Sequence, residues 1–248
     1  MTPMRELVYV SNHKLNQFLP DPKRRWRKFG RLRIGIRTPI GSASLEPLPS
    51  DLIEAQSERL QGAIQHIESK AQWYESTQIV PGQWIFFDAL LKFGVYGVSK
   101  AIALFVDART YSQGTRLLLH GSPKHLVVYA EPSPKLEATV EVGDPSDSYY
   151  FIDMVPKLPA LIGPLGGVSS HISSMKKGAR RRGIESGLRQ VVDALDSRLD
   201  SSTAAWMAGY ARVTASFDRS GWDKPRMVVA SPLYVERVEP PTPPSAGT

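Results

Sequence analysis

Two histidines and a serine hydroxyl lie close together near the middle of the chain. His120 and His125 flank a tight Gly-Ser-Pro turn, and Ser122 lies between them. Histidine changes its protonation state near neutral pH, and an adjacent imidazole can activate a hydroxyl as a nucleophile. The spacing therefore indicates a catalytic or ligand-binding site at the end of an apolar strand.

A serine-hydrolase site would need further groups. A nucleophilic serine requires a base, a group that orients this base, and donors for the oxyanion. The Gly-x-Ser-x-Gly turn of the α/β-hydrolases is absent, because Pro123 follows Ser122 and has no N–H to donate. The structural alternative is a short helix with Ser122 as its N-cap and Pro123 at its first position. Such a cap would contribute about 1 kcal/mol.

Residues 118–122 resemble the strand-end His-Gly-Ser motif of ADP-ribosyltransferases of the diphtheria-toxin-like class. The resemblance implies an enzyme that acts on NAD or a nucleotide, with His120 and Ser122 holding the nicotinamide ribose. It also implies a tyrosine that stacks on the nicotinamide, for which Tyr149 and Tyr150 are the candidates. Glu236 would be the late acid that stabilises the oxocarbenium-like ribose. The tyrosine and Glu236 lack the sequence context of that family.

Metal ligation is a third chemistry that histidines can support. No His-x-x-x-His or His-Glu-x-x-His spacing occurs in the chain. His120 and His125 are five residues apart across a turn, which is not a standard ligand pair. We therefore predict no metal site, and the residues identify no cofactor.

Two basic clusters stand out in a chain of net charge +7. One lies around residues 23–28 and the other around residues 176–182. Cations interleaved with an aromatic ring can bind phosphates and stack a base, and a positive charge of this size attracts acidic partners. The partner would be nucleic acid, a nucleotide or an acidic protein, whereas the alternative is solvated surface charge. The candidate contacts are Arg24, Arg25, Trp26, Arg27, Arg180, Arg181 and Arg182.

The composition is that of a globular protein. The chain has 248 residues, 42% of them hydrophobic, and no cysteine. The lack of cysteine excludes disulfides, thiolate nucleophiles and cysteine metal sites, and no apolar run approaches the roughly 18 residues of a membrane helix. We expect a soluble cytoplasmic protein with no membrane contact, one domain over residues 1–238, and a disordered Pro-rich tail over residues 239–248.

Apolar periodicity predicts an α+β fold: a central mixed sheet with two long amphipathic helices packed on it. Apolar positions three and four residues apart predict helices over residues 52–73 and 184–217. Residues 89–95 fit either a strand or a helical turn. The runs expected to form strands are residues 6–11, 31–37, 84–87, 101–106, 116–120, 126–129, 149–152 and 227–235.

Four segments together resemble an uncharacterised family of single-domain actinobacterial proteins. They are residues 8–14, 84–88, 117–126 and 230–235, and the resemblance extends over residues 5–238. It implies a bacterial cytosolic setting and an accessory role, such as a sensor or a component of a defence or signalling operon. It implies no activity and no catalytic residue.

A non-catalytic binding or regulatory module is the leading interpretation of the sequence. Its ligand site is expected at the strand ends, at Ser11, His120, Ser122 and His125. The alternatives are the NAD- or nucleotide-dependent enzyme, with His120, Ser122 and Glu236 as candidate catalytic residues, and a nucleic-acid-binding accessory protein.

Overall fold

The computed structural model describes residues 5–18, 50–96, 102–109, 114–127, 144–158, 162, 177–219 and 225–241. The chain divides into two compact units, Asn12–Ser69 and Met1–Ser11 with Lys70–Thr248. The smaller unit contains α1 (Asn12–Leu15), the 3₁₀ turn η1 (Asn16–Phe18) and α3 (Ser50–Glu68). The larger unit contains every strand described below and the candidate site.

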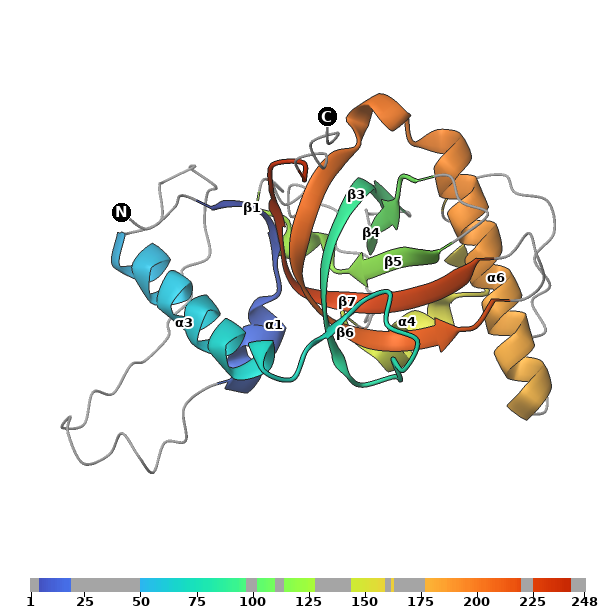
Figure 1. Ribbon diagram of the computed structural model, residues 1–248, viewed down its shortest axis with the longest axis horizontal. Helices are drawn as coiled ribbons and strands as arrows, with labels where there is room; N and C mark the ends of the chain where they lie inside the picture. Colours follow the sequence, from blue (N-terminus) through green and yellow to red (C-terminus); the bar gives the residue numbers. More distant parts are fainter. Residues whose placement is uncertain are drawn as a thin grey trace, which may run out of the picture. The chain divides into compact units, whose positions relative to one another are not determined.

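One seven-stranded sheet forms the larger unit (Figure 1). Its strands are β1 (Glu6–Val10), β2 (Gln72–Trp73), β3 (Trp84–Tyr96), β4 (Ile102–Asp107), β5 (Thr115–Gly121), β6 (Ala205–Phe217) and β7 (Arg226–Arg237). Its helical segments are η2 (Pro123–His125), α4 (Ser148–Met154), α6 (Lys177–Arg198) and η4 (Ser201–Thr203).

Five of these strands close into a barrel. The order around the barrel is β3, β4, β5, β7 and β6, and β6 pairs again with β3. β5 and β7 run parallel, whereas the other four pairs are antiparallel. β1 pairs with β7, and the short β2 pairs with β3. The expected mixed sheet is confirmed, and its closure leaves β3 to β7 without free edges in the barrel.

Alternate side chains of every barrel strand point into an apolar interior. This inner core includes Phe87 and Leu91 of β3, Phe105 of β4, Leu119 of β5 and Val228 of β7, all of which are almost completely buried. At Gly209 a Cβ atom would overlap the carbonyl oxygen of Tyr234. Glycine is therefore required at this position of β6, beside the backbone of β7.

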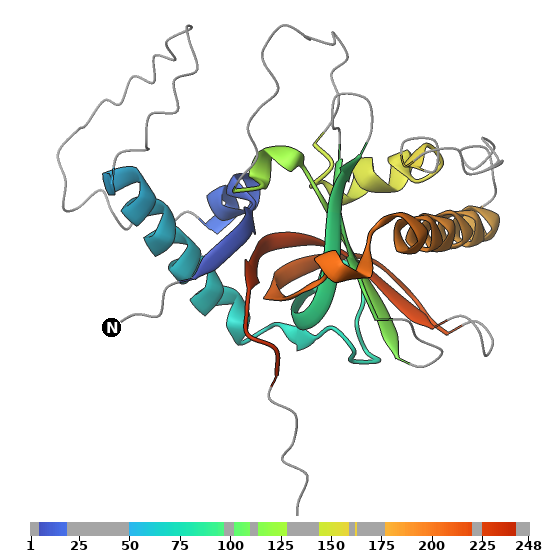
Figure 2. The ribbon, with the colours of Figure 1, turned by 90° about the horizontal axis from the view of Figure 1, so that it is seen from above.

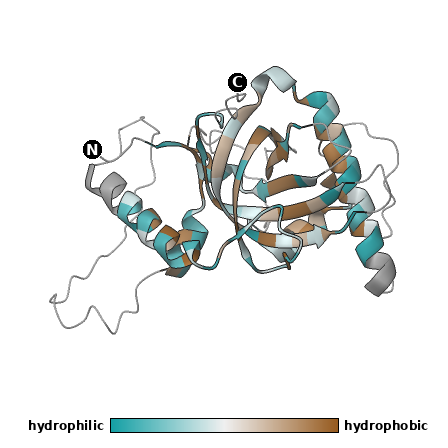
Figure 3. Ribbon diagram, in the orientation of Figure 1, coloured by the Kyte–Doolittle hydropathy of each residue, from teal (hydrophilic) through white to brown (hydrophobic). Residues whose placement is uncertain are grey.

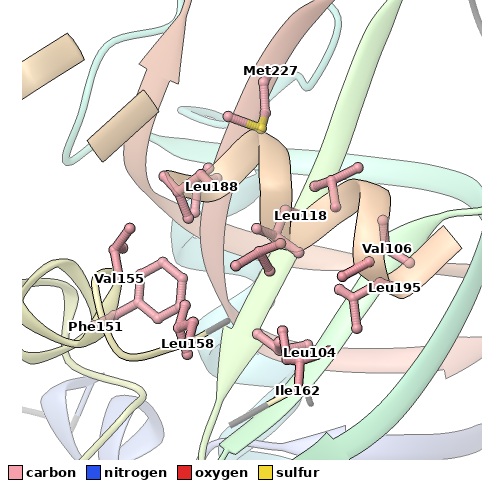
Figure 4. Packing of buried hydrophobic residues seen from close by; sticks show 14 of the residues in the cluster. Leu104, Val106, Leu118, Phe151, Val155, Leu158, Ile162, Leu188, Leu195 and Met227 are labelled. Atoms are coloured by element: carbon pink, nitrogen blue, oxygen red, sulfur yellow. The ribbon is translucent and has the colours of Figure 1, made fainter. Parts of the chain in front are cut away.

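A second core lies between the barrel and its helices. α4 and α6 lie on the same side of the barrel (Figure 2) and cover the outer faces of β4, β5 and β7. Polar and apolar residues alternate around α6 (Figure 3), and its apolar side packs on the barrel through Leu188, Val191 and Leu195. Figure 4 shows Leu188 and Leu195 close to Leu118 of β5.

Leu118→Ala should destabilise the protein by about 2–5 kcal/mol, because Leu118 is fully buried and alanine would leave a cavity between β5 and α6. Chemical denaturation measures this loss. A change below about 1 kcal/mol would contradict the packing of α6 on the barrel.

The prediction of one helix over residues 184–217 is wrong. α6 ends at Arg198, and residues 205–217 form β6. Asp200 accepts a hydrogen bond from the backbone N–H of Ser202 (2.8 Å) and caps η4, which separates the two elements. Burial then alternates along β6, as the period of a strand requires, with Met207, Gly209, Ala211 and Val213 facing the interior.

Two other predicted strands are corrected. Residues 148–154 form α4, because the Asp147 carboxylate accepts from the N–H groups of Tyr149 and Tyr150 and caps a helix. The segment after the histidine turn forms η2 and a single bridge between Leu126 and Tyr9, and Val127 lies in a turn. The rest of residues 126–129 lies outside the described residues.

The remaining predictions differ from the structure mainly in where helices and strands begin and end. Residues 89–95 continue β3, and residues 72–73 form β2 instead of the end of a helix. Of the two helices predicted to pack on the sheet, α6 contacts the barrel, whereas α3 belongs to the smaller unit. The predicted strand at residues 31–37 and the tail beyond Pro241 lie outside the described residues. No helix among the described residues is long and apolar enough to cross a membrane.

Candidate functional site

β5 carries His120 to the outer face of the barrel, beneath α4. The imidazole is fully buried and stacks on the ring of Phe151, with ring centroids 3.7 Å apart and planes 8° from parallel. The helix cap at Asp147 and the packing of Phe151 thus fix α4 directly over the histidine.

Both ring nitrogens of His120 have hydrogen-bond partners. Nδ1 lies 2.7 Å from the carbonyl oxygen of Pro145, and Nε2 lies 2.7 Å from Oγ1 of Thr214. A carbonyl oxygen only accepts, so Nδ1 carries the proton, and in the neutral ring Nε2 accepts from the Thr214 hydroxyl. Ser148 Oγ lies 3.0 Å from Thr214 Oγ1 and donates to it in this arrangement. A chain of hydrogen bonds therefore runs from the buried imidazole to Ser148.

A β-bulge in β6 provides Thr214. The pairing of β6 with β7 shifts between Val213 and Ala215, so that Thr214 is the extra residue. A bulge redirects a side chain out of the regular alternation of a strand. Sequence analysis missed Thr214 and Ser148, because the partner of His120 is 94 residues away and no local motif marks a bulge.

Ser146 joins several elements at the same end of the barrel. Its Oγ lies 3.1 Å from the Tyr9 hydroxyl and accepts from the N–H of Ser122 (3.0 Å), and its carbonyl oxygen accepts from Ser231 Oγ (2.8 Å). Burial raises the pKa of the Tyr9 hydroxyl, which therefore stays protonated. A Cβ at Gly121 would overlap this hydroxyl. The Gly-Ser turn is thus part of a buried polar network.

The other predicted ligand-binding residues lie near this network. Ser11 is fully buried, and its N–H donates to the carbonyl oxygen of Leu233 (2.7 Å). Ser122 precedes the short helix η2 as predicted, with Pro123 following it, but its side chain makes no capping hydrogen bond. The His125 ring contacts the Tyr9 ring edge-on, at 5.6 Å between centroids.

The residues of the ADP-ribosyltransferase-like motif are not all brought together. Glu236 lies six residues beyond Ala230, the β7 partner of Leu119, which is roughly 20 Å along the strand. It forms an ion pair with Arg5 at 2.9 Å, and burial raises the pKa of its carboxyl group. Tyr149 is 75% exposed on α4.

The predicted nucleic-acid contacts are described in part. Arg24, Arg25, Trp26 and Arg27 lie outside the described residues, and for Arg180 only the helical backbone is described. Arg181 and Arg182 are exposed in the first turns of α6. Among the described residues, no group of three or more acidic or histidine side chains could hold a metal ion.

A groove of about 350 Å³ lies between α4, α6 and the end of β6. Its apolar wall is formed by Pro81, Ile152, Ile184, Ala215 and Phe217, and Arg181 and Ser216 complete the lining. Ser148 and Thr214 are not part of this lining, although Ser148 precedes Ile152 by one helical turn on α4 and Thr214 precedes Ala215 on β6. The Arg181 guanidinium contacts the carbonyl oxygen of Ser216 at 3.4 Å.

Comparisons with known proteins place the chain in a family without assigning it an activity. No curated protein and no solved structure matches it significantly. A family model described as a family of unknown function (DUF7019) matches residues 5–239, which is nearly the whole chain. The chain belongs to this family of unknown function.

Proposed function

We propose that the protein is a non-catalytic binding or regulatory module whose ligand is a small apolar molecule that carries an anionic group. The groove between α4, α6 and β6 is the observation that supports this proposal. Its volume falls within the range of small-molecule sites, which are mostly apolar with a few well-placed polar groups. Among the described residues that line it, Arg181 is the one with a charge, and a guanidinium suits a carboxylate, sulfonate or phosphate.

The polar groups of the lining, Arg181 and Ser216, would orient the ligand. The contact of the Arg181 guanidinium with the carbonyl oxygen of Ser216 (3.4 Å) places the charged group before the ligand binds. Groups fixed in this way lose little conformational freedom when a ligand binds.

Burial of His120 supports binding over catalysis. A general base must come within hydrogen-bond reach of the proton that it removes from a substrate. Both nitrogens of this imidazole have partners inside the protein, and Phe151 covers one face of the ring. An accessory or sensor role in a bacterial defence or signalling operon is the further part of the proposal.

Titration with 8-anilinonaphthalene-1-sulfonate tests the groove, because this dye combines an apolar body with an anionic group. We expect saturable fluorescence enhancement with the native protein. Arg181→Ala should weaken dye binding about fivefold, as expected for the loss of about 1 kcal/mol of ionic contact. Arg182→Ala is the matched control, since Arg182 is equally exposed on α6 but does not line the groove.

Equal dye affinity of the native protein and the Arg181 variant would contradict an anion contact in the groove. A second variant, Ile152→Arg, places a large charged side chain on the apolar wall and should abolish saturable binding. Unchanged binding by this variant would show that the dye binds elsewhere.

A further inference from the structure

The outer face of β3 and β6 carries an unusual number of aromatic side chains. Ile85, Phe87, Met207 and Ala211 face the barrel interior. Because side chains alternate along a strand, their neighbours Trp84 and Phe86 on β3, and Trp206 and Tyr210 on β6, point outward. Three of the chain's five tryptophans lie on this surface once Trp73 of β2 is included. We call the outward side chains of β2, β3 and β6, with the adjoining Tyr234 of β7, the aromatic face.

The strand register aligns four of these rings in one row. Phe86 pairs with Trp73 on one side and with Tyr210 on the other, and Tyr210 pairs with Tyr234. Successive ring centroids along this row are 5.0, 6.5 and 6.0 Å apart. Phe86 is 40% exposed, Trp73 and Tyr210 are half-buried, and Tyr234 lies beneath the Arg5 guanidinium.

The helical layer of the larger unit leaves this face accessible. α4 and α6 pack on the outer faces of β4, β5 and β7 instead. On the aromatic face Asp88 and Arg212 are exposed, and Trp84, Trp206 and Tyr210 are partly exposed. Exposed, contiguous aromatic surface on a folded protein usually marks a binding site.

We propose that the aromatic face binds single-stranded nucleic acid, with bases stacked on Phe86, Tyr210 and Trp73. Aromatic rings beside cations bind single strands with little sequence preference, because every base has a π-face. Arg212 is exposed and pairs in register with Trp84, so it can contact the phosphate backbone beside the stacked bases. The net charge of +7 adds long-range attraction for a polyanion.

Three carboxylates also lie near this face. Glu75 accepts a hydrogen bond from the indole N–H of Trp73 (3.4 Å) and pairs with Arg109 (3.4 Å), so its charge is compensated. Glu236 is held by Arg5 at 2.9 Å, so its charge is compensated. Asp88 is exposed two residues from Phe86, and it would repel a nearby phosphate. If nucleic acid binds at this face, removing the Asp88 charge should therefore strengthen binding.

The strand order resembles that of a nucleic-acid-binding fold, but the binding face of that fold is covered in this protein. Three consecutive antiparallel strands, a helical connection, and a last strand parallel to the third give the order of an OB-fold barrel. Such barrels bind oligonucleotides or oligosaccharides on their second and third strands, which correspond to β4 and β5 here. The outer face of β4 and β5 carries α4 and α6 in this protein, so the uncovered aromatic face on β3 and β6 is the candidate surface.

Fluorescence anisotropy with a labelled oligothymidylate, which stays single-stranded, tests the proposal on the full chain. We expect binding at low salt that weakens steeply as salt rises. The double variant Phe86→Ala/Tyr210→Ala should lose about tenfold or more in affinity, as expected when two stacked bases are lost. Arg212→Ala should weaken binding and reduce the salt slope by about one. Asp88→Asn should bind more tightly.

Tyr149→Ala is the matched control, because Tyr149 is an exposed aromatic residue on α4, outside the aromatic face. It should bind like the native protein. Arg212→Ala and Asp88→Asn change exposed side chains, so they test the proposal even if the double variant fails to fold. Absence of binding at low salt, or native affinity of both the double variant and Arg212→Ala, would overturn the proposal and favour a protein partner for this face.

Discussion

Replacing Arg109 with methionine should destabilise the protein by about 3–5 kcal/mol. Arg109 pairs with Asp107, the fully buried last residue of β4, through Nε (3.0 Å to Oδ1) and Nη2 (2.8 Å to Oδ2). The same guanidinium contacts the Tyr74 hydroxyl and lies 3.4 Å from Glu75. Methionine fills part of the space but leaves the Asp107 carboxylate buried without its cation.

Chemical denaturation of a double-mutant cycle separates this penalty from simple loss of packing. Asp107→Leu combined with Arg109→Met removes both charges, so the double variant should be more stable than the sum of the single losses predicts. Arg182→Ala, an exposed change on α6, should stay within about 0.5 kcal/mol of the native protein. A loss below about 1 kcal/mol for Arg109→Met would show that Asp107 is hydrated in solution.

His120→Ala should also cost about 3–5 kcal/mol, even without any ligand. The substitution removes the stack on Phe151 and leaves the buried carbonyl of Pro145 and the hydroxyl of Thr214 without their imidazole partner. The loop before α4 and the bulge in β6 are held by these contacts, so both should loosen. Thermal and chemical unfolding of the protein without ligand measure the effect.

Ser122→Ala is the matched control for the histidine turn. The Ser122 side chain makes no capping hydrogen bond, so its loss should change stability by no more than about 0.5 kcal/mol. If Ser122 capped η2, as the sequence predicts, the same substitution would cost about 1 kcal/mol of stability. Native-like stability of His120→Ala would contradict the structural role of the imidazole. It would favour a ligand-binding role for the histidine turn instead.

Local patterns predicted the central strands but not the closure of the barrel. β4 and β5 are short apolar runs between turn signals, and this pattern identifies strands without tertiary information. Closure depends on β6, whose alanines and evenly spaced large residues also fit a helix. Pairing of β6 with both β3 and β7 decides in favour of a strand, and such contacts between distant residues are not visible in a local window.

At the candidate site, the local sequence likewise predicts where His120 lies but not which residues it contacts. The sequence places His120 at a strand end beside a glycine turn, and this placement is confirmed. Its contacts come from Pro145, Phe151 and Thr214, which belong to a loop, to α4 and to a bulge in β6. The hydrogen-bond partners of His120 are therefore set by the tertiary fold and not by the local sequence. The aromatic face did have a local signal, since Trp84 and Phe86 alternate with buried residues.

Native mass spectrometry of the gently purified full chain tests the proposed binding function most directly. The native protein and Arg182→Ala should each retain a small molecule in a fixed ratio, whereas Ile152→Arg should release it and Arg181→Ala should retain less of it. Collision-induced release would then give the mass of the ligand, and negative-ion detection would show its anionic group. A native protein that carries no small molecule, or equal retention by all four proteins, would contradict a ligand site in the groove between α4, α6 and β6.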